Sequence, residues 1–268
     1  MQGDITTRWS DAEEYDRTMG RHSRLLAPLF IRFIGSIHDG DHVLDVGCGT
    51  GSLTFTIANT AHPSKIVGVD SSVPFIEYVR STNADPRVTF EVGDAQHLPY
   101  PNASFDKSLS LLAIHLVPDP PGAIAEMRRV TRPGGMVAVC SWDSPGGLET
   151  GTIFRKAVTA LDPSAEIQRH GTFRRKEGTL RDLLVELGLR EVEETAVTFQ
   201  MNFDLFDELW SHWLKSGGHI QSYLDKLSPE HKQALRDRLC QEVFKGRPDG
   251  PFTIPARALA ARGKVADH

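Results

Sequence analysis

Three aspartates, each placed where an apolar run ends, are the residues best suited to bind a ligand. They are Asp45, Asp70 and Asp94. Side chains at the carboxyl ends of neighbouring parallel strands meet at one edge of an open α/β sheet, where such sheets bind ligands. A carboxylate accepts hydrogen bonds from an ammonium group, from sugar hydroxyls or from an exocyclic amino group. The pattern therefore predicts one site for a ligand that carries such donors.

A glycine-rich turn follows the first of these runs, HVLDV. Its glycines, Gly47, Gly49 and Gly51, let the backbone turn sharply and approach a ligand without Cβ atoms in the way. The next segment has helical spacing, so its first amides favour an anionic or carbonyl-rich group. The spacing G-x-G-x-G differs from the dinucleotide fingerprint, whose last small position is occupied here by Ser52. Asp45 would repel a pyrophosphate but would accept an ammonium group.

The second and third aspartates favour a nucleoside. Asp70 closes the strand-like run KIVGVD, where an acid can accept hydrogen bonds from both hydroxyls of a ribose. Asp94 follows the alternating run RVTFEV, and its carboxylate suits an adenine amino group while the amide of Ala95 donates to a ring nitrogen. Asp70 alone also fits a nicotinamide dinucleotide, but Asp94 and the altered fingerprint argue against one.

Three strings carry a resemblance to a known family. VLDVGCGTG resembles motif I of the class I S-adenosylmethionine-dependent methyltransferases, GDAQHLP resembles their adenine-recognition element, and RVTRPGG resembles their turn after a helix. The resemblance covers about residues 40–145 with specific motifs. It is loose elsewhere, as in the methyltransferase type 11 group that includes quinone-biosynthesis enzymes. It implies S-adenosyl-L-methionine as the cofactor.

The resemblance also implies which residues hold that cofactor. Asp45 and the glycine turn would hold its methionine end, Asp70 its ribose, and Asp94 with Ala95 its adenine. The full set of cofactor-binding candidates is Asp45, Gly47, Cys48, Gly49, Asp70, Ser71, Asp94, Ala95 and Leu111.

His115 is the candidate catalytic residue, because histidine is common at this point of the family. A histidine beside the transferable methyl group would take a proton from a substrate hydroxyl or amine. Alternatively, it forms hydrogen bonds that hold its loop. Leu116 stands where many relatives have an aromatic residue or a second histidine, which weighs against a shared catalytic duty.

Three aromatic residues are candidates for substrate contact. The resemblance implies that the segment before motif I lies across the cofactor as a lid, which makes Tyr15 a candidate. Trp142 ends the fifth predicted strand, and Trp210 belongs to an aromatic helical insertion of the kind that forms substrate walls in this family. The alternatives are a solvated helix face for Tyr15 and core packing for Trp210.

Five strands alternating with helices, then a helix and a late strand pair, predict an α/β fold with a mostly parallel sheet. The resemblance implies a Rossmann-like, doubly wound sheet of seven strands in the order 3-2-1-4-5-7-6, with an antiparallel last pair. We expect a single methyltransferase domain over 1–268, divided as follows: N-terminal lid and helix 1–38, cofactor-binding core 40–145, substrate-side loops and helical insertion 146–250, last strand 251–262. An apolar stripe predicts the inward face of the N-terminal helix: Leu25, Leu26, Leu29, Phe30, Phe33 and Ile34.

Composition limits the partners. A net charge of −5 gives no electrostatic case for nucleic acid or anionic membrane, so we expect a small-molecule substrate. There is no apolar run of membrane-spanning length, no export signal and no cysteine–histidine cluster with zinc-like spacing, which predicts a cytoplasmic protein without a metal. One basic cluster would steer an acidic substrate or form a solvated loop: Arg169, His170, Arg174, Arg175 and Lys176.

The predicted activity is transfer of a methyl group to an oxygen, nitrogen or carbon nucleophile of a small molecule. Two alternatives stay open, a non-catalytic module that binds an adenosyl compound and, with less support, a nicotinamide-dependent dehydrogenase. A homodimer is left open as the assembly.

Overall fold

The computed structural model describes residues 12–143, 147–165, 176–215 and 218–267. The chain divides into two compact units. The described part of the first unit comprises 12–143, 176–197 and 258–267, and that of the second comprises 147–165, 198–215 and 218–257. The single domain over 1–268 stays a prediction.

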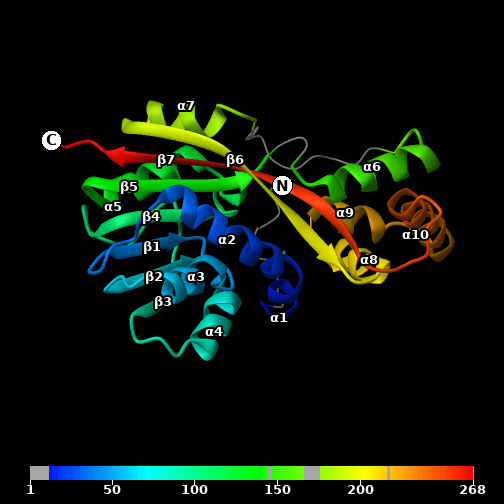
Figure 1. Cartoon of the computed structure of the whole chain (residues 1–268), viewed down its shortest axis with the longest axis horizontal. Coiled ribbons are helices and arrows are strands. Elements are labelled where there is room, and N and C mark those ends of the chain that lie inside the picture. Colours follow the sequence, from blue (N-terminus) through cyan, green and yellow to red (C-terminus); the bar gives the residue numbers. More distant parts are fainter. Residues whose placement is uncertain (1–11, 144–146, 166–175, 216–217, 268) are drawn as a thin grey trace. The chain divides into compact units, whose positions relative to one another are not determined.

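The strands form one seven-stranded sheet in the order β3-β2-β1-β4-β5-β7-β6, which confirms the predicted order. Strands β1 to β5 run parallel, and β7 pairs antiparallel to β5. Figure 1 shows the five parallel strands side by side. Their bounds and those of the last two strands are β1 His42–Val46, β2 Lys65–Asp70, β3 Val88–Val92, β4 Phe105–Leu111, β5 Thr131–Trp142, β6 Leu189–Phe203 and β7 Phe252–Val265.

Helices precede the sheet, connect its strands and form the insertion predicted before the last strand. In the first unit they are α1 Ala12–Tyr15, the short π-helical segment η2 Asp16–Gly20, α2 Arg21–Ile34, α3 Ser52–Thr60, α4 Val73–Thr82, the 3₁₀ turn η3 Ile114–Leu116, α5 Pro120–Val130 and α7 Thr179–Glu186. In the second unit they are α6 Glu149–Leu161, α8 Phe206–Lys215, α9 Gly218–Leu224 and α10 Pro229–Phe244. No helix of the described residues has the length and apolarity to cross a bilayer.

The predicted stripe on α2 is wrong at one position. Leu25 is 42% exposed, whereas His22 and Ala27 are buried. The buried face of α2 centres on Ala27 and Phe30, so it is rotated from the predicted stripe. Because a helix turns about 100° per residue, Leu25 then lies outside this face.

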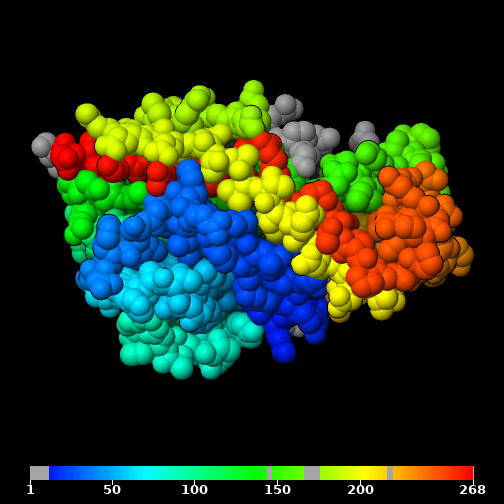
Figure 2. All heavy atoms as spheres, in the orientation of Figure 1, coloured from blue at the N-terminus to red at the C-terminus, as the bar shows by residue number. Residues whose placement is uncertain are grey.

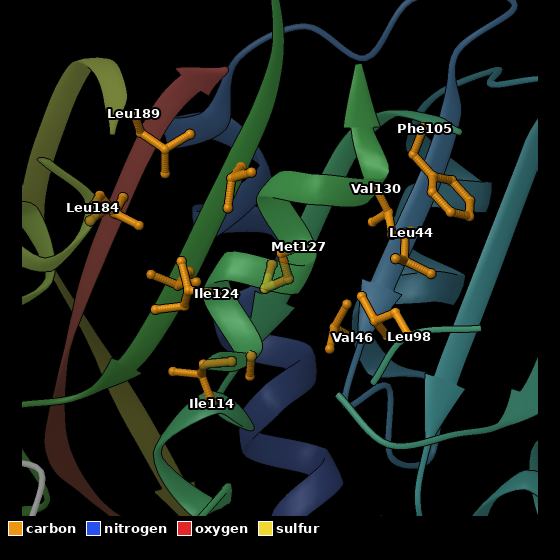
Figure 3. Packing of buried hydrophobic residues seen from close by; sticks show 14 of the residues in the cluster. Leu44, Val46, Leu98, Phe105, Ile114, Ile124, Met127, Val130, Leu184 and Leu189 are labelled. Atoms are coloured by element: carbon orange, nitrogen blue, oxygen red, sulfur yellow. The ribbon is translucent and has the colours of Figure 1, made fainter. Parts of the chain in front are cut away.

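Alternate residues of β1 point to opposite faces of the sheet. Leu44 and Val46 belong to a core cluster with Ile124 of α5 and Leu184 of α7, as Figure 3 shows. Asp45 points to the other face, where α3 packs. The strand thus places one acid between two buried apolar residues.

The second unit has an aromatic core of its own. The ring of Phe154 on α6 lies 5.4 Å from that of Trp213 on α8, and Phe206 and Phe244 pack at 6.3 Å. Trp213 and Phe206 are fully buried, so most of the aromatic residues of the insertion serve core packing. Trp210 is half-buried on α8.

A buried ion pair joins the beginnings of β1 and β4. Lys107 Nζ donates to Asp41 Oδ2 at 2.7 Å, and the amide of His38 donates to the same oxygen at 2.9 Å. Burial alone would raise the pKa of Asp41, but these hydrogen bonds and the charge of Lys107 lower it overall.

Replacing Asp41 with asparagine should lower the free energy of unfolding by about 3 to 5 kcal/mol at pH 7, because the Lys107 ammonium would stay buried without its partner. A carboxyl whose pKa is lowered on folding stabilises the fold above its ordinary pKa, and this stabilisation is lost as the pH falls through the lowered value. The difference between the proteins should therefore shrink below about pH 4.

Urea unfolding of both proteins over this pH range measures the effect. Asp39→Asn, at an exposed neighbouring position, is the matched control and should change stability by less than about 0.5 kcal/mol. Equal stabilities of the two variants would show that the pair does not hold the strands.

Candidate functional site

The carboxyl ends of the parallel strands lie along one edge of the sheet. Val46 of β1 pairs with Val69, Asp70 of β2 pairs with Val92, and Leu111 of β4 lies beside its partner in β5. The chain leaves β1 for β2 on one side and returns to β4 on the other. This reversal is the point at which open α/β sheets bind ligands.

The glycine turn after β1 is fixed by hydrogen bonds to β2. The amides of Gly47 and Cys48 donate to the carbonyl oxygen of Val69 at 2.8 and 3.1 Å, and the amide of Gly49 donates to Asp70 Oδ2 at 2.9 Å. Gly47 has φ +72°, and a Cβ atom there would lie 2.2 Å from the Cβ of Ala113. The turn therefore requires glycine for both its conformation and its close contact.

Asp45 is buried beside this turn and is only partly satisfied. Its Oδ2 accepts from the amide of Thr54 at 3.1 Å and from the hydroxyl of Thr54 at 2.6 Å. Its Oδ1 has no hydrogen-bond partner within the described residues. Burial raises the pKa of Asp45 to about 7, and the charge of Asp70 adds to the shift. A cationic donor at Oδ1 would remove the cost of this unsatisfied buried atom.

One carboxylate oxygen of Asp70 accepts a hydrogen bond from the glycine turn, and the other accepts one from the residue that precedes α4. Besides the amide of Gly49 at Oδ2, Asp70 accepts from the amide of Ser72 at Oδ1, 2.9 Å away. Burial raises the pKa of Asp70, against the opposing effect of these amides. A carboxylate offers about four acceptor positions, and the amides of Ser72, Gly49 and Ser71 leave room for a ligand hydroxyl. Ser71, the adjacent candidate, is exposed.

Asp94 lies at the end of the next strand and is more open to solvent. Its side chain is 49% exposed, and its Oδ1 accepts from the amide of Gln96 at 2.9 Å, which holds its pKa below the ordinary value. The amide of Gly93 donates to the carbonyl oxygen of Asp70 at 3.0 Å. Asp94 and the half-buried Ala95 therefore follow Asp70 along the same edge, with the carboxylate accessible.

The N-terminal segment lies over the glycine turn. A Cβ atom on Gly49 would be 3.7 Å from the ring of Tyr15, and this ring lies 4.7 Å from that of Phe75 on α4. Burial raises the pKa of Tyr15, with smaller contributions from Asp70 and Asp16. Figure 2 shows the dark blue N-terminal helices against the cyan segment that contains α4. Tyr15 thus lies beside the glycine turn, and its role in a lid stays a prediction.

Side-chain hydrogen bonds hold the N-terminal segment together and join it to the turn. Ser52 Oγ donates to the carbonyl oxygen of Gly20 at 3.3 Å, and Arg24 Nη1 donates to Asp16 Oδ1 at 2.6 Å. A Cβ atom on Gly20 would lie 2.7 Å from Asp16 Oδ1 and 3.2 Å from Thr50 Oγ1. Sequence analysis did not single out Gly20, although a glycine inside an otherwise helical stretch is a signal of such a close contact.

His115 lies in η3, just beyond β4. Its Nδ1 is 3.0 Å from Ser141 Oγ on β5. Leu112, between the strand and η3, has φ +57°, and its amide donates to the carbonyl oxygen of Cys140 at 2.8 Å. Leu111 is buried at the end of β4, and Trp142 is buried at the end of β5.

The remaining candidates lie elsewhere. Trp210 belongs to the second unit, whereas the residues above belong to the first. Arg169, His170, Arg174 and Arg175 lie outside the described residues, and their neighbour Lys176 is exposed. Within the described ranges, no group of three His, Cys, Asp or Glu side chains is arranged to hold a metal ion.

Comparison with known proteins shows which family the segment that carries this site resembles. Residues 44–139 match the family model of a methyltransferase domain. Over this stretch the chain is similar to class I S-adenosylmethionine-dependent methyltransferases. One relative is the 27-O-demethylrifamycin SV methyltransferase of Amycolatopsis mediterranei, 39% identical over 142 residues, or 49% of this chain and 52% of the relative. The chain thus spans about half the length of that relative.

Two solved structures share the methyltransferase fold. YcgJ of Bacillus subtilis is 18% identical, with a TM-score of 0.58 over 92% of this chain and 100% of its own. The phosphoethanolamine N-methyltransferase 2 of Haemonchus contortus, in complex with S-adenosyl-L-methionine, is 17% identical, with a TM-score of 0.55 over 95% of this chain and 60% of its own. The match to the family model runs from β1 to β5 and so includes the glycine turn and all three aspartates.

Gly47→Ala should destabilise the protein much more than Gly40→Ala does. Both glycines have positive φ, +72° and +90°, but a Cβ at Gly40 would meet nothing within 4 Å. Gly40→Ala should cost about 1 to 2 kcal/mol for the left-handed backbone alone. Gly47→Ala should cost at least about 2 kcal/mol more, because its Cβ overlaps that of Ala113.

Chemical denaturation of the two variants and the parent protein measures both costs. Adding Ala113→Gly to Gly47→Ala should recover part of the extra loss, because it removes the opposing Cβ atom. Equal costs for the two single variants would contradict the close contact between the turns.

Proposed function

We propose that this chain transfers the methyl group of S-adenosyl-L-methionine to an oxygen, nitrogen or carbon nucleophile of a small molecule. The observation that carries the proposal is Asp45 Oδ1, a buried carboxylate oxygen with no partner in the described part of the chain, beside the glycine turn. A ligand with an ammonium group next to a nucleoside would satisfy this oxygen and Asp70 together.

Each part of the cofactor has a matching group at the edge of the sheet. We assign its ammonium group to Asp45, its ribose hydroxyls to the remaining acceptor positions of Asp70, and its adenine to Asp94 and the amide of Ala95. Gly47, Cys48, Gly49, Ser71 and Leu111 complete the proposed site. The residues present therefore fit S-adenosylmethionine.

The sulfonium supplies an activated methyl group: the acceptor's lone pair forms the new bond to carbon while the carbon–sulfur electron pair stays on sulfur, giving a neutral thioether. The protein then contributes positioning and exclusion of water. Tyr15 lies where it would cover the bound cofactor, and Trp142 lies at the same edge as His115. We propose Tyr15, Trp142 and His115 as candidates for substrate contact, and the substrate role of Trp210, which belongs to the second unit, stays a separate prediction.

Incubating the purified chain with methyl-labelled cofactor and a small-molecule extract tests the proposal. Mass spectrometry should detect S-adenosylhomocysteine together with a labelled product. Hydroxyl compounds are the first pure acceptors to try, because the Amycolatopsis relative is named for a 27-O position. Cofactor binding without any labelled product would indicate a non-catalytic module, and tight binding of a nicotinamide dinucleotide would indicate a dehydrogenase.

Asp70→Asn should weaken cofactor binding about 10- to 100-fold, because hydrogen bonds to a charged group contribute about 1.5 to 3 kcal/mol. Isothermal titration calorimetry with S-adenosylhomocysteine measures the change. Asp39→Asn, an exposed change of the same kind, should leave the affinity unaltered. An unchanged affinity in Asp70→Asn would remove the ribose assignment.

Cofactor affinity should rise with pH up to about 7, by as much as tenfold per pH unit, because only ionised Asp45 attracts the ammonium group and its pKa in the free protein is about 7. Above about pH 8 the affinity should fall as the cofactor's own amino group loses its proton. In the free protein the sign is opposite: a carboxyl whose pKa is raised on folding lowers stability as the pH rises from about 4 to 7.

Calorimetry at several pH values checks this dependence. Asp45→Asn should bind more weakly and lose most of the slope below pH 7. The same slope in both proteins would show that a group other than Asp45 controls binding.

A further inference from the structure

We propose that Glu126 and Arg129 of α5 are positioning residues, which hold the loop of residues 93–104 so that the Asp94 carboxylate and the Ala95 amide recognise an adenine base. The inference rests on the proposed function, which assigns the adenine of the cofactor to those two groups. Glu126 and Arg129 act through the backbone of the loop, without touching the base.

The loop of residues 93–104 joins β3 to β4 and contains no helix or strand. The amide of Gly93 donates to the carbonyl oxygen of Asp70 at 3.0 Å, which ties the beginning of the loop to β2. The amide of His97 donates to the carbonyl oxygen of Asp94 at 3.0 Å, which closes a turn. Loops are generally more mobile than the elements they connect, so the residues that follow this turn need a further hold.

Arg129 provides that hold with all the N–H donors of its guanidinium group. Its Nε and Nη2 donate to the two carboxylate oxygens of Glu126 at 2.7 and 2.8 Å. Nη2 also donates to the carbonyl oxygen of Leu98 at 3.0 Å. Nη1 donates to the carbonyl oxygen of Tyr100 at 2.8 Å and to Asn102 Oδ1 at 2.9 Å. Because the guanidinium group is planar and rigid, these bonds fix the middle of the loop against α5.

Glu126 completes the hold on Leu98. Its Oε2 accepts from the amide of Leu98 at 2.9 Å, so both backbone polar groups of Leu98 are bound by this pair of side chains. Hydrogen bonds from Arg129 and from this amide lower the pKa of Glu126, so its carboxylate is ionised at neutral pH. The side chain of Leu98 is buried in the core cluster with Val46 and Met127, as Figure 3 shows. Packing and hydrogen bonds together thus fix both the place and the orientation of this peptide.

The hold on Leu98 controls where the adenine-binding groups lie, because Ala95 precedes it by three residues. Adenine presents a donor, its exocyclic amino group, beside an acceptor, a ring nitrogen. The Asp94 carboxylate and the Ala95 amide must therefore both lie within hydrogen-bond distance at once. A misplacement of about 1 Å can cost on the order of 10²-fold. Loss of the pair should thus weaken binding of the base and spare the contacts of Asp45 and Asp70 with the rest of the cofactor.

Calorimetry with two compounds that differ in the base tests the inference. S-inosylhomocysteine has an oxygen in place of the amino group of S-adenosylhomocysteine and a proton on the adjacent ring nitrogen. The parent protein should prefer the adenine compound about 10- to 100-fold. Arg129→Lys keeps the charge but loses the planar donors, and it should lower this preference about tenfold. Glu126→Gln, which keeps the size and one acceptor oxygen, should lower it less. Arg128→Lys, at an exposed position of the same helix, is the control and should leave both affinities unchanged.

Amide hydrogen exchange of the unliganded proteins gives a readout of the loop itself. The Leu98 amide should exchange about tenfold faster in Arg129→Lys and Glu126→Gln, while the amides of β4 keep their parent rates and show that the fold is intact. An unchanged Leu98 amide, or an equal loss of affinity for both compounds, would overturn the inference. A parent protein that binds neither compound would instead refute the proposed function, and the exchange rates would still decide whether the pair holds the loop.

Discussion

The site depends on the bonding of the turn after β1 to the end of β2. Two amides of the turn share the carbonyl oxygen of Val69, and a third reaches the carboxylate of Asp70. The turn cannot relax without breaking these bonds, and Asp70 cannot rotate away without freeing the amide of Gly49. One strand register, Val46 beside Val69, therefore places the glycine backbone beside the acid.

Two buried aspartates in the same unit show how structural and ligand-binding acids differ. Asp41 and Asp45 are both almost fully buried, at 7% and 1% exposure. Asp41 is paired with Lys107 and its pKa is lowered, whereas Asp45 has only Thr54 as a donor within the described residues and its pKa is raised to about 7. The protein compensates the first charge internally. The second remains costly until a cation arrives, which is the usual arrangement of a binding group in a functional site.

The sequence was most informative where function depends on local spacing. The glycine turn was predicted from a run of a few residues and the strand order from the family resemblance, and the structure confirms both. Thr54 and Ser141 were not predicted, because their roles arise from contacts across a helix turn or between strands. The rotated face of α2, with Leu25 exposed, has the same origin, since periodicity shows that a face exists but packing decides its centre.

The backbone of Leu112 shows how the fold connects the glycine turn to His115. A leucine at φ +57° is strained by about 1 to 2 kcal/mol. This conformation reverses the chain immediately after β4. It persists because the amide of Leu112 donates to the carbonyl oxygen of Cys140. Ala113 then closes against Gly47, and His115 reaches Ser141 on the neighbouring strand. Strain held by surrounding contacts is typical of functional sites. Through Ala113, the turn after β1 is in direct contact with the turn that carries His115.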